Sequence, residues 1–481
     1  MVIHSLSSAH AGDAAATTPY TFKAGYPTGA SGRHAAEDAD FQRAVTAYRF
    51  WYPTVSMQAI FEASHGAGLK DNEAMFVMAT GPRHVGFTLN SDTPYAAAVL
   101  DLRAGPIVID VPPGPYIGLV DDHHQRWIVD VGLPSPDRDK GGKVLLVPPG
   151  DAGEVPAGYR VGRASSVQVF LAVRALPLKG EPAALDALRA VRIYPLASAA
   201  SPPPIETPDM TSKPMDFTPL RWEDKLEFWK VLASILDTEP SAPEFAAMQG
   251  LLAPLGIVKG KPFAPDARQR ALLERAARVG RDQLLVSAWE SQRADKQVWS
   301  DRRWEWAGLI ADNGNFETPS GLDLEARDRW FAQAIAASPA MFRRTSGAGS
   351  LYWLGLRDSS GAYLDGGQHY KLSIPLPVPA KLFWSVTVYD AQTRSQVQTD
   401  RDQAALRSLF ELKDAGQGRR LDLYFGPSAP RGQETRWIQT VPGRGWFVYL
   451  RLYAPAANAF DGQWKPGDFE RVAVESLAGP V

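Results

Sequence analysis

Two segments near the end of the chain alternate apolar and polar side chains with the two-residue period of a β-strand. They are residues 381–390 (KLFWSVTVYD) and 445–455 (GWFVYLRLYAP), and both are rich in the aromatic and β-branched residues that favour strands. In the second segment one face holds Trp446, Val448, Leu450 and Leu452, and the opposite face holds Phe447, Tyr449, Arg451 and Tyr453. We therefore expect two buried, neighbouring strands with one face in a hydrophobic core and the other face available to a ligand.

Shorter runs of the same kind predict a β-rich unit on each side of a helical middle region. The strand-like runs cover residues 106–111, 116–120, 127–131, 143–147 and 167–175, and then 351–356, 370–375, 382–389, 421–425, 436–441 and 446–453. Apolar residues recur with the 3.6-residue period of a helix in 222–236, 243–255, 267–286 and 323–342. The pattern indicates an α+β fold, with two antiparallel β-sandwich or jelly-roll-like domains joined by helices.

Changes in composition along the chain give the domain boundaries. The small and polar residues 1–40 are interpreted as a flexible tail, and a leading helix with a β-rich domain follows in 41–200. A proline-rich linker and the helical region occupy 201–345, and the C-terminal jelly-roll-like domain occupies 346–481. Pro53 is expected to kink or break the leading helix. The charged residues of 223–230 (EDKLEFWK) are interpreted as a solvated helix face.

Length, charge and cysteine content exclude several kinds of partner. With 481 residues the chain suits two or three domains, and its formal net charge of -2 gives no reason to expect nucleic acid or an anionic membrane. The absence of cysteine excludes disulfides and thiolate chemistry, and no apolar run approaches the roughly 20 residues that span a bilayer. We expect a small-molecule ligand as the partner, with no nucleic acid and no membrane, and the sequence leaves a homo-oligomer open.

Several motifs in tandem order resemble a pair of bacterial domains. The pieces LNSDTPYAAAVLDL and PPGPYIGLVDDHHQRWIVDVG are similar to domain of unknown function 1254, and LYWLGLRDSSGAYLDGGQHYKLSIPLP, LFWSVTVYD and FVYLRLYAP resemble domain of unknown function 1214. The resemblance implies two antiparallel β domains joined by helices, and a bacterial origin that frequently includes an export signal. A periplasmic or secreted location is therefore favoured over the cytoplasm, although this chain has no signal-peptide pattern.

The segment 90–95 (NSDTPY) is the first candidate for a functional site. Asn and Asp side chains commonly cap backbone amides in turns, and Pro94 would fix the exit of the chain into a strand. The functional alternative makes Asp92 a general acid or base or a ligand clamp, with Tyr95 beside it and Asn90 in contact with the substrate. The resemblance also picks out Asp92 and Tyr95.

The densest titratable cluster is the run Asp121, Asp122, His123 and His124. On a strand, alternation places Asp122 and His124 on one face, so that a carboxylate can orient an imidazole for proton transfer. A divalent metal held by His123 or His124 is an alternative that needs a third ligand from elsewhere. The remaining interpretation is a polar strand end whose charges meet water.

Arg451 lies between Tyr449 and Tyr453 on one strand face, and this pattern predicts a ligand clamp. A guanidinium group stacks on aromatic rings and binds carboxylates with two parallel hydrogen bonds. Trp384 and Tyr389, from the neighbouring strand, are expected to form aromatic walls of the same site. The alternative is that Arg451 only covers the surface of the sheet.

Two hypotheses about function follow, because the common catalytic signatures are missing. Gly-x-Ser-x-Gly, HExxH and complete phosphate-loop or dinucleotide fingerprints do not occur, so no organic cofactor is predicted. The favoured hypothesis is an enzyme, a hydrolase or lyase, that acts on a small organic substrate, aromatic or carboxylate-bearing, by acid–base hydrolysis or elimination. Its catalytic residues would be Asp92, Tyr95, Asp122 and His124, and convergence of these side chains in one cleft would favour it. The alternative is a non-catalytic binding protein for carbohydrate or aromatic ligands.

Overall fold

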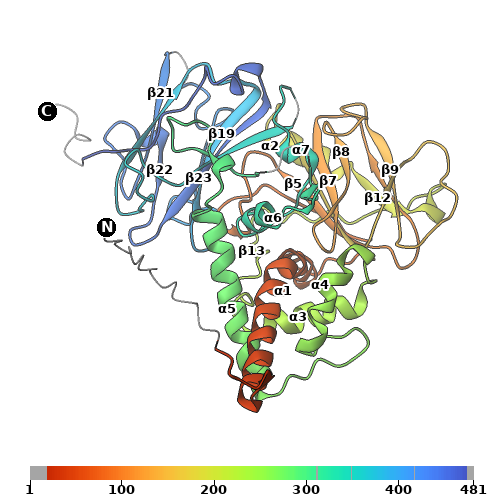
Figure 1. The fold of residues 1–481 in the computed structure, drawn as a ribbon. Helices are drawn as coiled ribbons and strands as arrows, with labels where there is room; N and C mark the ends of the chain where they lie inside the picture. The colour runs from red at the N-terminus through yellow and green to blue at the C-terminus, as the bar shows by residue number, and fades with distance from the viewer. Residues whose placement is uncertain (1–18, 310–312, 348, 416–417, 474–481) are drawn as a thin grey trace, which may run out of the picture.

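The computed structural model describes residues 19–309, 313–347, 349–415 and 418–473. Two β-sandwiches lie beside each other, and a group of helices lies below both of them in the view of Figure 1. This arrangement confirms the predicted α+β fold, in which antiparallel sheets are joined by helices.

The N-terminal sandwich packs a five-stranded sheet against a four-stranded sheet. The first sheet has the order β3 (Phe76–Met78), β5 (Tyr95–Asp101), β11 (Gln168–Ala175), β7 (Tyr116–Asp122) and β8 (Trp127–Gly132). The second has the order β10 (Arg160–Arg163), β9 (Gly142–Val147), β6 (Ile107–Val111) and β12 (Arg192–Pro195). Alternate residues such as Ala96, Ala98 and Leu100 point into the core between the two sheets, together with α2 (Glu181–Arg189).

The C-terminal sandwich is built in the same way. One sheet has the order β14 (Glu305–Trp306), β17 (Ser350–Gly355), β23 (Trp446–Pro455), β19 (Ala380–Asp390) and β20 (Ala405–Arg407). The other has the order β22 (Trp437–Gln439), β21 (Arg420–Gly426), β18 (Tyr370–Pro375) and β24 (Glu470–Arg471). The prediction that the two aromatic-rich segments are neighbouring strands is confirmed, because β19 and β23 pair antiparallel at the centre of their sheet.

Helices and short paired strands form much of the rest of the described chain. The helices are α1 (Gly29–Gly66), α3 (Leu226–Thr238), α4 (Ala246–Gly250), α5 (Ala267–Trp289), α6 (Leu324–Phe331) and α7 (Pro339–Phe342). Short strands pair as β1 (Phe22–Lys23) with β2 (Tyr26–Pro27), β4 (His84–Val85) with β13 (Met215–Asp216), and β15 (Glu317–Thr318) with β16 (Gly321–Leu322). Residues 29–40 were expected to be part of a flexible tail, but they belong to α1. The Thr28 side chain caps this helix by accepting a hydrogen bond from the Ser31 amide.

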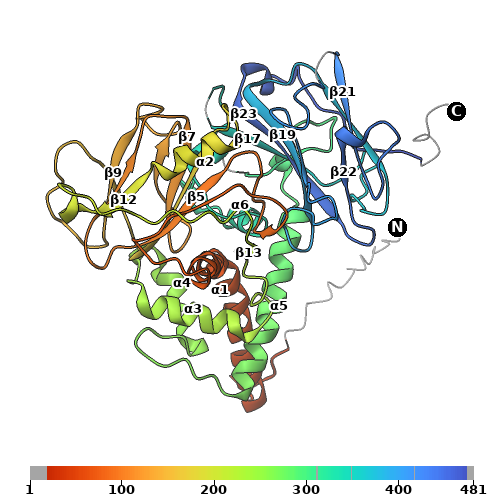
Figure 2. The same cartoon turned by 180° about the vertical axis from the view of Figure 1, so that it is seen from behind.

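Helix α1 contains Pro53 and changes direction along its length. Figures 1 and 2 show one part of the helix beside α5 and another part pointing toward or away from the viewer under the N-terminal sandwich. A proline inside a helix removes one hydrogen bond and kinks the axis, so the expected kink is confirmed. The turn allows the first part to pack on α3 and α5 and the second part, with Ile60 and Phe61, to pack on the N-terminal sheet.

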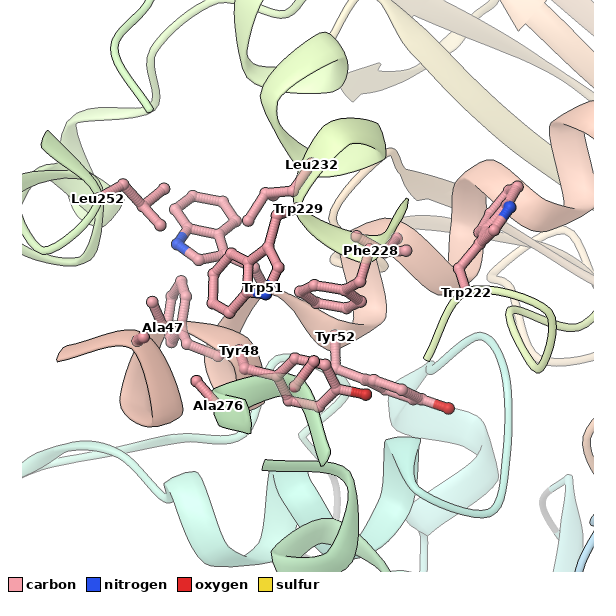
Figure 3. Close-up of a cluster of buried hydrophobic side chains, with 14 of the residues drawn as sticks. Ala47, Tyr48, Trp51, Tyr52, Trp222, Phe228, Trp229, Leu232, Leu252 and Ala276 are labelled. Atoms are coloured by element: carbon pink, nitrogen blue, oxygen red, sulfur yellow. The ribbon is translucent and has the colours of Figure 1, made fainter. Parts of the chain in front are cut away.

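An aromatic cluster joins the helices to each other (Figure 3). Tyr48 and Trp51 of α1 pack against Phe228 and Trp229 of α3, and the ring centroids of Tyr48 and Phe228 are 4.1 Å apart. Trp229 is fully buried, and its indole N–H donates to the Leu273 carbonyl oxygen of α5 over 2.8 Å. The cluster therefore fixes the helices against each other.

We expect Gly280→Ala in α5 to destabilise the protein by about 1–3 kcal/mol, although alanine is the better helix former by about 1 kcal/mol. A Cβ atom at Gly280 would lie 2.4 Å from the buried Tyr48 ring, so the two helices or the ring must shift. Gly32→Ala in α1 is the matched control, because a Cβ atom there meets nothing within 4 Å, and this change should be neutral or stabilising. Urea unfolding of the three proteins measures the difference, and equal stability of Gly280→Ala and wild type would contradict the close packing.

Candidate functional site

A cavity lies between the two sandwiches, where one sheet of each faces the other. Its walls come from β3, β5, β7 and β11 on one side and from β17 and β23 on the other. Further lining comes from Ile60 of α1, from residues 87–90, and from residues between 330 and 341 at the end of α6, in α7 and between these two helices. The centres of water-sized spheres can occupy about 120 Å³ of this cavity. By the same measure, a cavity that holds one water molecule has a volume of roughly 10–15 Å³. It is therefore large enough for an organic molecule.

Strand alternation explains which residues form the N-terminal wall of the cavity. Phe170, Ala172 and Arg174 of β11 line the cavity, while the residues between them enter the sandwich core. Arg174 pairs across the strands with Tyr95, and its guanidinium carbon lies 5.8 Å from the Tyr95 ring centre. The wall is therefore apolar along most of its length and carries one cation at the end of β11.

The C-terminal wall is the polar face that the sequence predicted. Tyr449 and Arg451 of β23 line the cavity with Ser350 and Tyr352 of β17, and Tyr352 is the cross-strand partner of Arg451. The opposite face of this sheet enters the core of the C-terminal sandwich. Trp384 belongs to that core, so it lies away from the cavity wall that it was expected to form.

Arg451 is only 2% exposed and makes three hydrogen bonds to neutral oxygens. Its Nη1 donates to the Thr387 hydroxyl over 3.0 Å, and its Nη2 donates to the Thr88 carbonyl over 3.0 Å and to the Tyr389 hydroxyl over 2.7 Å. Its Nε has no hydrogen-bond partner among the described residues. Tyr389 thus positions Arg451 from behind the cavity wall.

Asp92 joins the turn to the C-terminal sheet and is 1% exposed. Its Oδ2 accepts hydrogen bonds from the Ser385 hydroxyl at 2.7 Å and from the Tyr453 hydroxyl at 2.9 Å. The Asp92 amide donates to Asn90 Oδ1 over 3.0 Å, so the segment is also the capped turn that its sequence suggested. Asn90 and Tyr95 line the cavity, whereas Asp92 and Tyr453 lie one layer behind.

Burial keeps the phenols of this site neutral. It raises the pKa of Tyr95, Tyr389, Tyr449 and Tyr453 above the ordinary value of 10.0, and neighbouring arginines offset only part of this rise. The Tyr95 hydroxyl accepts a hydrogen bond from Asn90 Nδ2 at 2.9 Å, which leaves its own proton available to a ligand. The site therefore offers hydrogen-bond donors and positive charge.

Asp122 and His124 have no contacts in common with Asp92. Asp122 caps a turn by accepting from the backbone amides of His124 and Arg126, and it also accepts from the Ser165 hydroxyl. The His124 ring is 3.0 Å from the Thr54 hydroxyl, and burial lowers its pKa to about 4. These contacts hold the turn after β7 against α1.

His123 is also buried, with its Nδ1 3.0 Å from Glu239 Oε1. Within the described residues no three His, Asp or Glu side chains are grouped so that they could hold a metal ion. The metal alternative for His123 or His124 therefore gains no third ligand from the described part of the chain. None of the described helices has the length and apolarity needed to cross a membrane.

Each wall of the cavity belongs to a segment that matches a known protein family. Residues 75–195 match the family described as "Protein of unknown function (DUF1254)", and residues 349–457 match "Protein of unknown function (DUF1214)". The chain pairs a DUF1254 domain with a DUF1214 domain. The cavity therefore lies where the DUF1254 sheet faces the DUF1214 sheet, with helices of the intervening segment closing it.

A solved structure has a fold similar to that of this chain. A crystal structure of a Vibrio parahaemolyticus protein is similar with a TM-score of 0.57 and 18% identity, and the match covers 90% of this chain and 100% of that chain. An uncharacterised Burkholderia cenocepacia protein aligns with a TM-score of 0.42 and 12% identity over 93% of this chain and 98% of that one. No curated protein sequence matches the chain.

Arg174 and Tyr352 both line the cavity, and neither was predicted from the sequence. A signal for Arg174 was available, because it is the one charged residue in the otherwise apolar strand 169–175. An arginine in such a run is costly to bury unless it has partners or a ligand. No comparable signal marked Tyr352, since aromatic residues are common in both faces of strands.

Proposed function

We propose that the protein binds a small organic molecule with a largely apolar body in the cavity between the DUF1254 and DUF1214 domains. The observation that carries this proposal is the lining itself. Most of it is aliphatic or aromatic, with Ile60, Phe76, Leu119 and Phe170 among its members, and it carries Arg174 near the end of β11 and Arg451 in the middle of β23. Apolar walls with a few convergent polar groups are typical of ligand sites in proteins.

The alternative of a buried void without a ligand is unfavourable for this lining. A void leaves its apolar walls without contacts, and cavities of this size cost stability in proportion to their volume. A ligand that fills the cavity recovers those contacts. Binding of an aromatic or aliphatic compound is therefore better supported than binding of a carbohydrate, whose many hydroxyl groups would meet few partners here.

A thermal-shift screen with aliphatic acids, aromatic acids, terpenoids and sugars tests the proposal. A ligand at about 100 times its dissociation constant should stabilise the native protein by roughly 2.7 kcal/mol. Ala172→Phe should abolish the shift, because Ala172 lines the cavity at the centre of the sheet and a phenyl ring there occupies the space of the ligand. Ala247→Phe on the exposed side of α4 is the control. A shift that survives Ala172→Phe would overturn this location.

A second candidate function is acid–base catalysis on the bound molecule, and Tyr95 favours it. Its hydroxyl lines the cavity, accepts from Asn90 and has a proton to donate. Hydrolysis or elimination assisted by this phenol stays a prediction. Incubation with a ligand found in the screen, followed by mass spectrometry, separates an enzyme from a binding protein, and Tyr95→Phe should then abolish turnover while binding persists.

A further inference from the structure

Two buried arginines from facing sheets line the same cavity. Arg174 comes from β11 of the N-terminal sandwich and is 9% exposed, and Arg451 comes from β23 of the C-terminal sandwich. An arginine side chain stays protonated in proteins. No Asp, Glu, Lys or His is among the described residues that line the cavity, so these two guanidinium groups are the charges at its surface.

Neither guanidinium forms an ion pair with a described carboxylate within 4.0 Å. Among the described residues, Arg451 donates hydrogen bonds to the neutral oxygens of Thr88, Thr387 and Tyr389. Arg174 lies among phenols, including Tyr95 and Tyr352. Two other buried arginines are paired, Arg329 with Glu305 at 2.7 Å and Arg394 with Glu223 at 2.8 Å. The buried Arg327 instead donates to the Phe50 carbonyl and forms no ion pair with a described carboxylate within 4.0 Å. A buried cation without an ion pair costs free energy that an incoming anion recovers.

The carboxylates near the two arginines do not line the cavity. Asp92 lies behind the C-terminal wall, where it interacts electrostatically with Arg451, and its Oδ2 accepts hydrogen bonds from Ser385 and Tyr453. Arg407 lies close to Asp92, but it is paired with Glu411 at 2.5 Å. Asp121 and Asp130 lie on the cavity side of the N-terminal sheet without lining the cavity, and burial raises the pKa of both carboxyl groups above the ordinary range.

From this geometry we infer that the cavity selects an organic monoanion, a carboxylate with an apolar body, whose charged end lies between Arg174 and Arg451. The inference rests on the proposed function, because it names the chemical class of the ligand. Guanidinium groups match the planar carboxylate with two parallel hydrogen bonds. A phosphate monoester carries a charge of about -1.5 to -2 at pH 7, so its burial in this largely apolar cavity would cost more free energy than the burial of a carboxylate.

The body of the ligand extends from the arginines toward Phe170. Along β11 the distance from residue 174 to residue 170 is about 13 Å at 3.3 Å per residue. The side chains between and around these positions, Ala97, Ala172 and Leu119, are apolar and line the cavity. The acid group is therefore expected at the end of the cavity near the C-terminal sheet and the apolar chain at the end near α1.

Calorimetric titration of the full chain with four eight-carbon compounds tests the inference. Octanoate, octan-1-ol, octylamine and octanedioate share a chain and differ in charge. We expect octanoate to bind at least tenfold more tightly than octan-1-ol, and octylamine and octanedioate to bind more weakly than octanoate. Arg451→Met should reduce the octanoate preference over octan-1-ol to less than threefold, and Arg174→Met serves the same purpose if Arg451→Met does not fold.

Arg431→Met is the matched control, because Arg431 is exposed and does not line the cavity. It should keep the full preference for octanoate. Equal binding of octanoate and octan-1-ol to the wild type would overturn the monoanion inference while leaving the cavity as a ligand site. Binding of none of the compounds here or in the broader screen would instead overturn the proposed function. An unchanged preference in both arginine variants would place the acid elsewhere.

Discussion

Replacing Arg394 with methionine is expected to lower the free energy of unfolding by about 3–5 kcal/mol. Arg394 follows β19 and is 1% exposed, and its Nη2 donates to Glu223 Oε2 over 2.8 Å. Its Nη1 donates to the Tyr52 hydroxyl over 3.2 Å and to the Ala332 carbonyl over 3.1 Å. One side chain therefore ties the C-terminal sandwich to α1, to α6 and to the segment before α3.

The cost arises because the substitution leaves Glu223 as a buried, unpaired carboxylate. Urea unfolding measures the loss, and Arg83→Met is the control, since the Arg83–Asp402 ion pair is exposed and should matter by less than about 1 kcal/mol. The double variant Arg394→Met with Glu223→Gln should be less destabilised than the two single changes added together. Equal costs for Arg394→Met and Arg83→Met would contradict the role of this pair.

Replacing Asp92 with asparagine should destabilise the ligand-free protein by about 3 kcal/mol or more. The change removes the carboxylate that interacts electrostatically with the buried Arg451, and it weakens the hydrogen bonds from Ser385 and Tyr453. A purely catalytic Asp92 would leave stability almost unchanged. The unfolding free energy therefore separates a structural charge from a group that acts only in turnover.

Two further variants make the Asp92 result specific. Tyr453→Phe removes one of the two hydrogen bonds to Asp92 and keeps its charge, so we expect a loss of only about 1 kcal/mol. Asp139→Asn changes an exposed carboxylate and should be neutral within about 0.5 kcal/mol. A wild-type-like Asp92→Asn protein would mean that Arg451 does not need this carboxylate, and it would contradict a structural role of Asp92.

Glu223 shows where sequence reasoning about charged residues fails. The segment 223–230 was interpreted as a solvated helix face, and that interpretation is wrong for Glu223, which is 6% exposed. Helical periodicity identifies the apolar face of a helix but not what covers its polar end. In the structure Arg394, from a distant part of the chain, pairs with Glu223 and covers it.

The Asp122–His124 pair illustrates the same limit in the candidate site. Alternation predicted a shared strand face for the two side chains, but strand β7 ends at Asp122 and a turn follows. In that turn Asp122 caps backbone amides and His124 packs on Trp51 and Phe245. Whether Asp122 caps a turn depends on where the strand ends. The ends of helices and strands are the features that a sequence pattern predicts least accurately.

The sequence by itself determined the strand and helix types, the α+β class, the family pair and the polar face that carries Tyr449, Arg451 and Tyr453. These features depend on the spacing of side chains along the chain, because the period of the backbone decides which residues share a face. Only the tertiary structure decided that Arg174 faces the same cavity as Arg451, that Asp92 lies behind that wall and that Trp384 does not line it. These features depend on which distant faces pack together, and that choice is made by contacts between segments far apart in the chain.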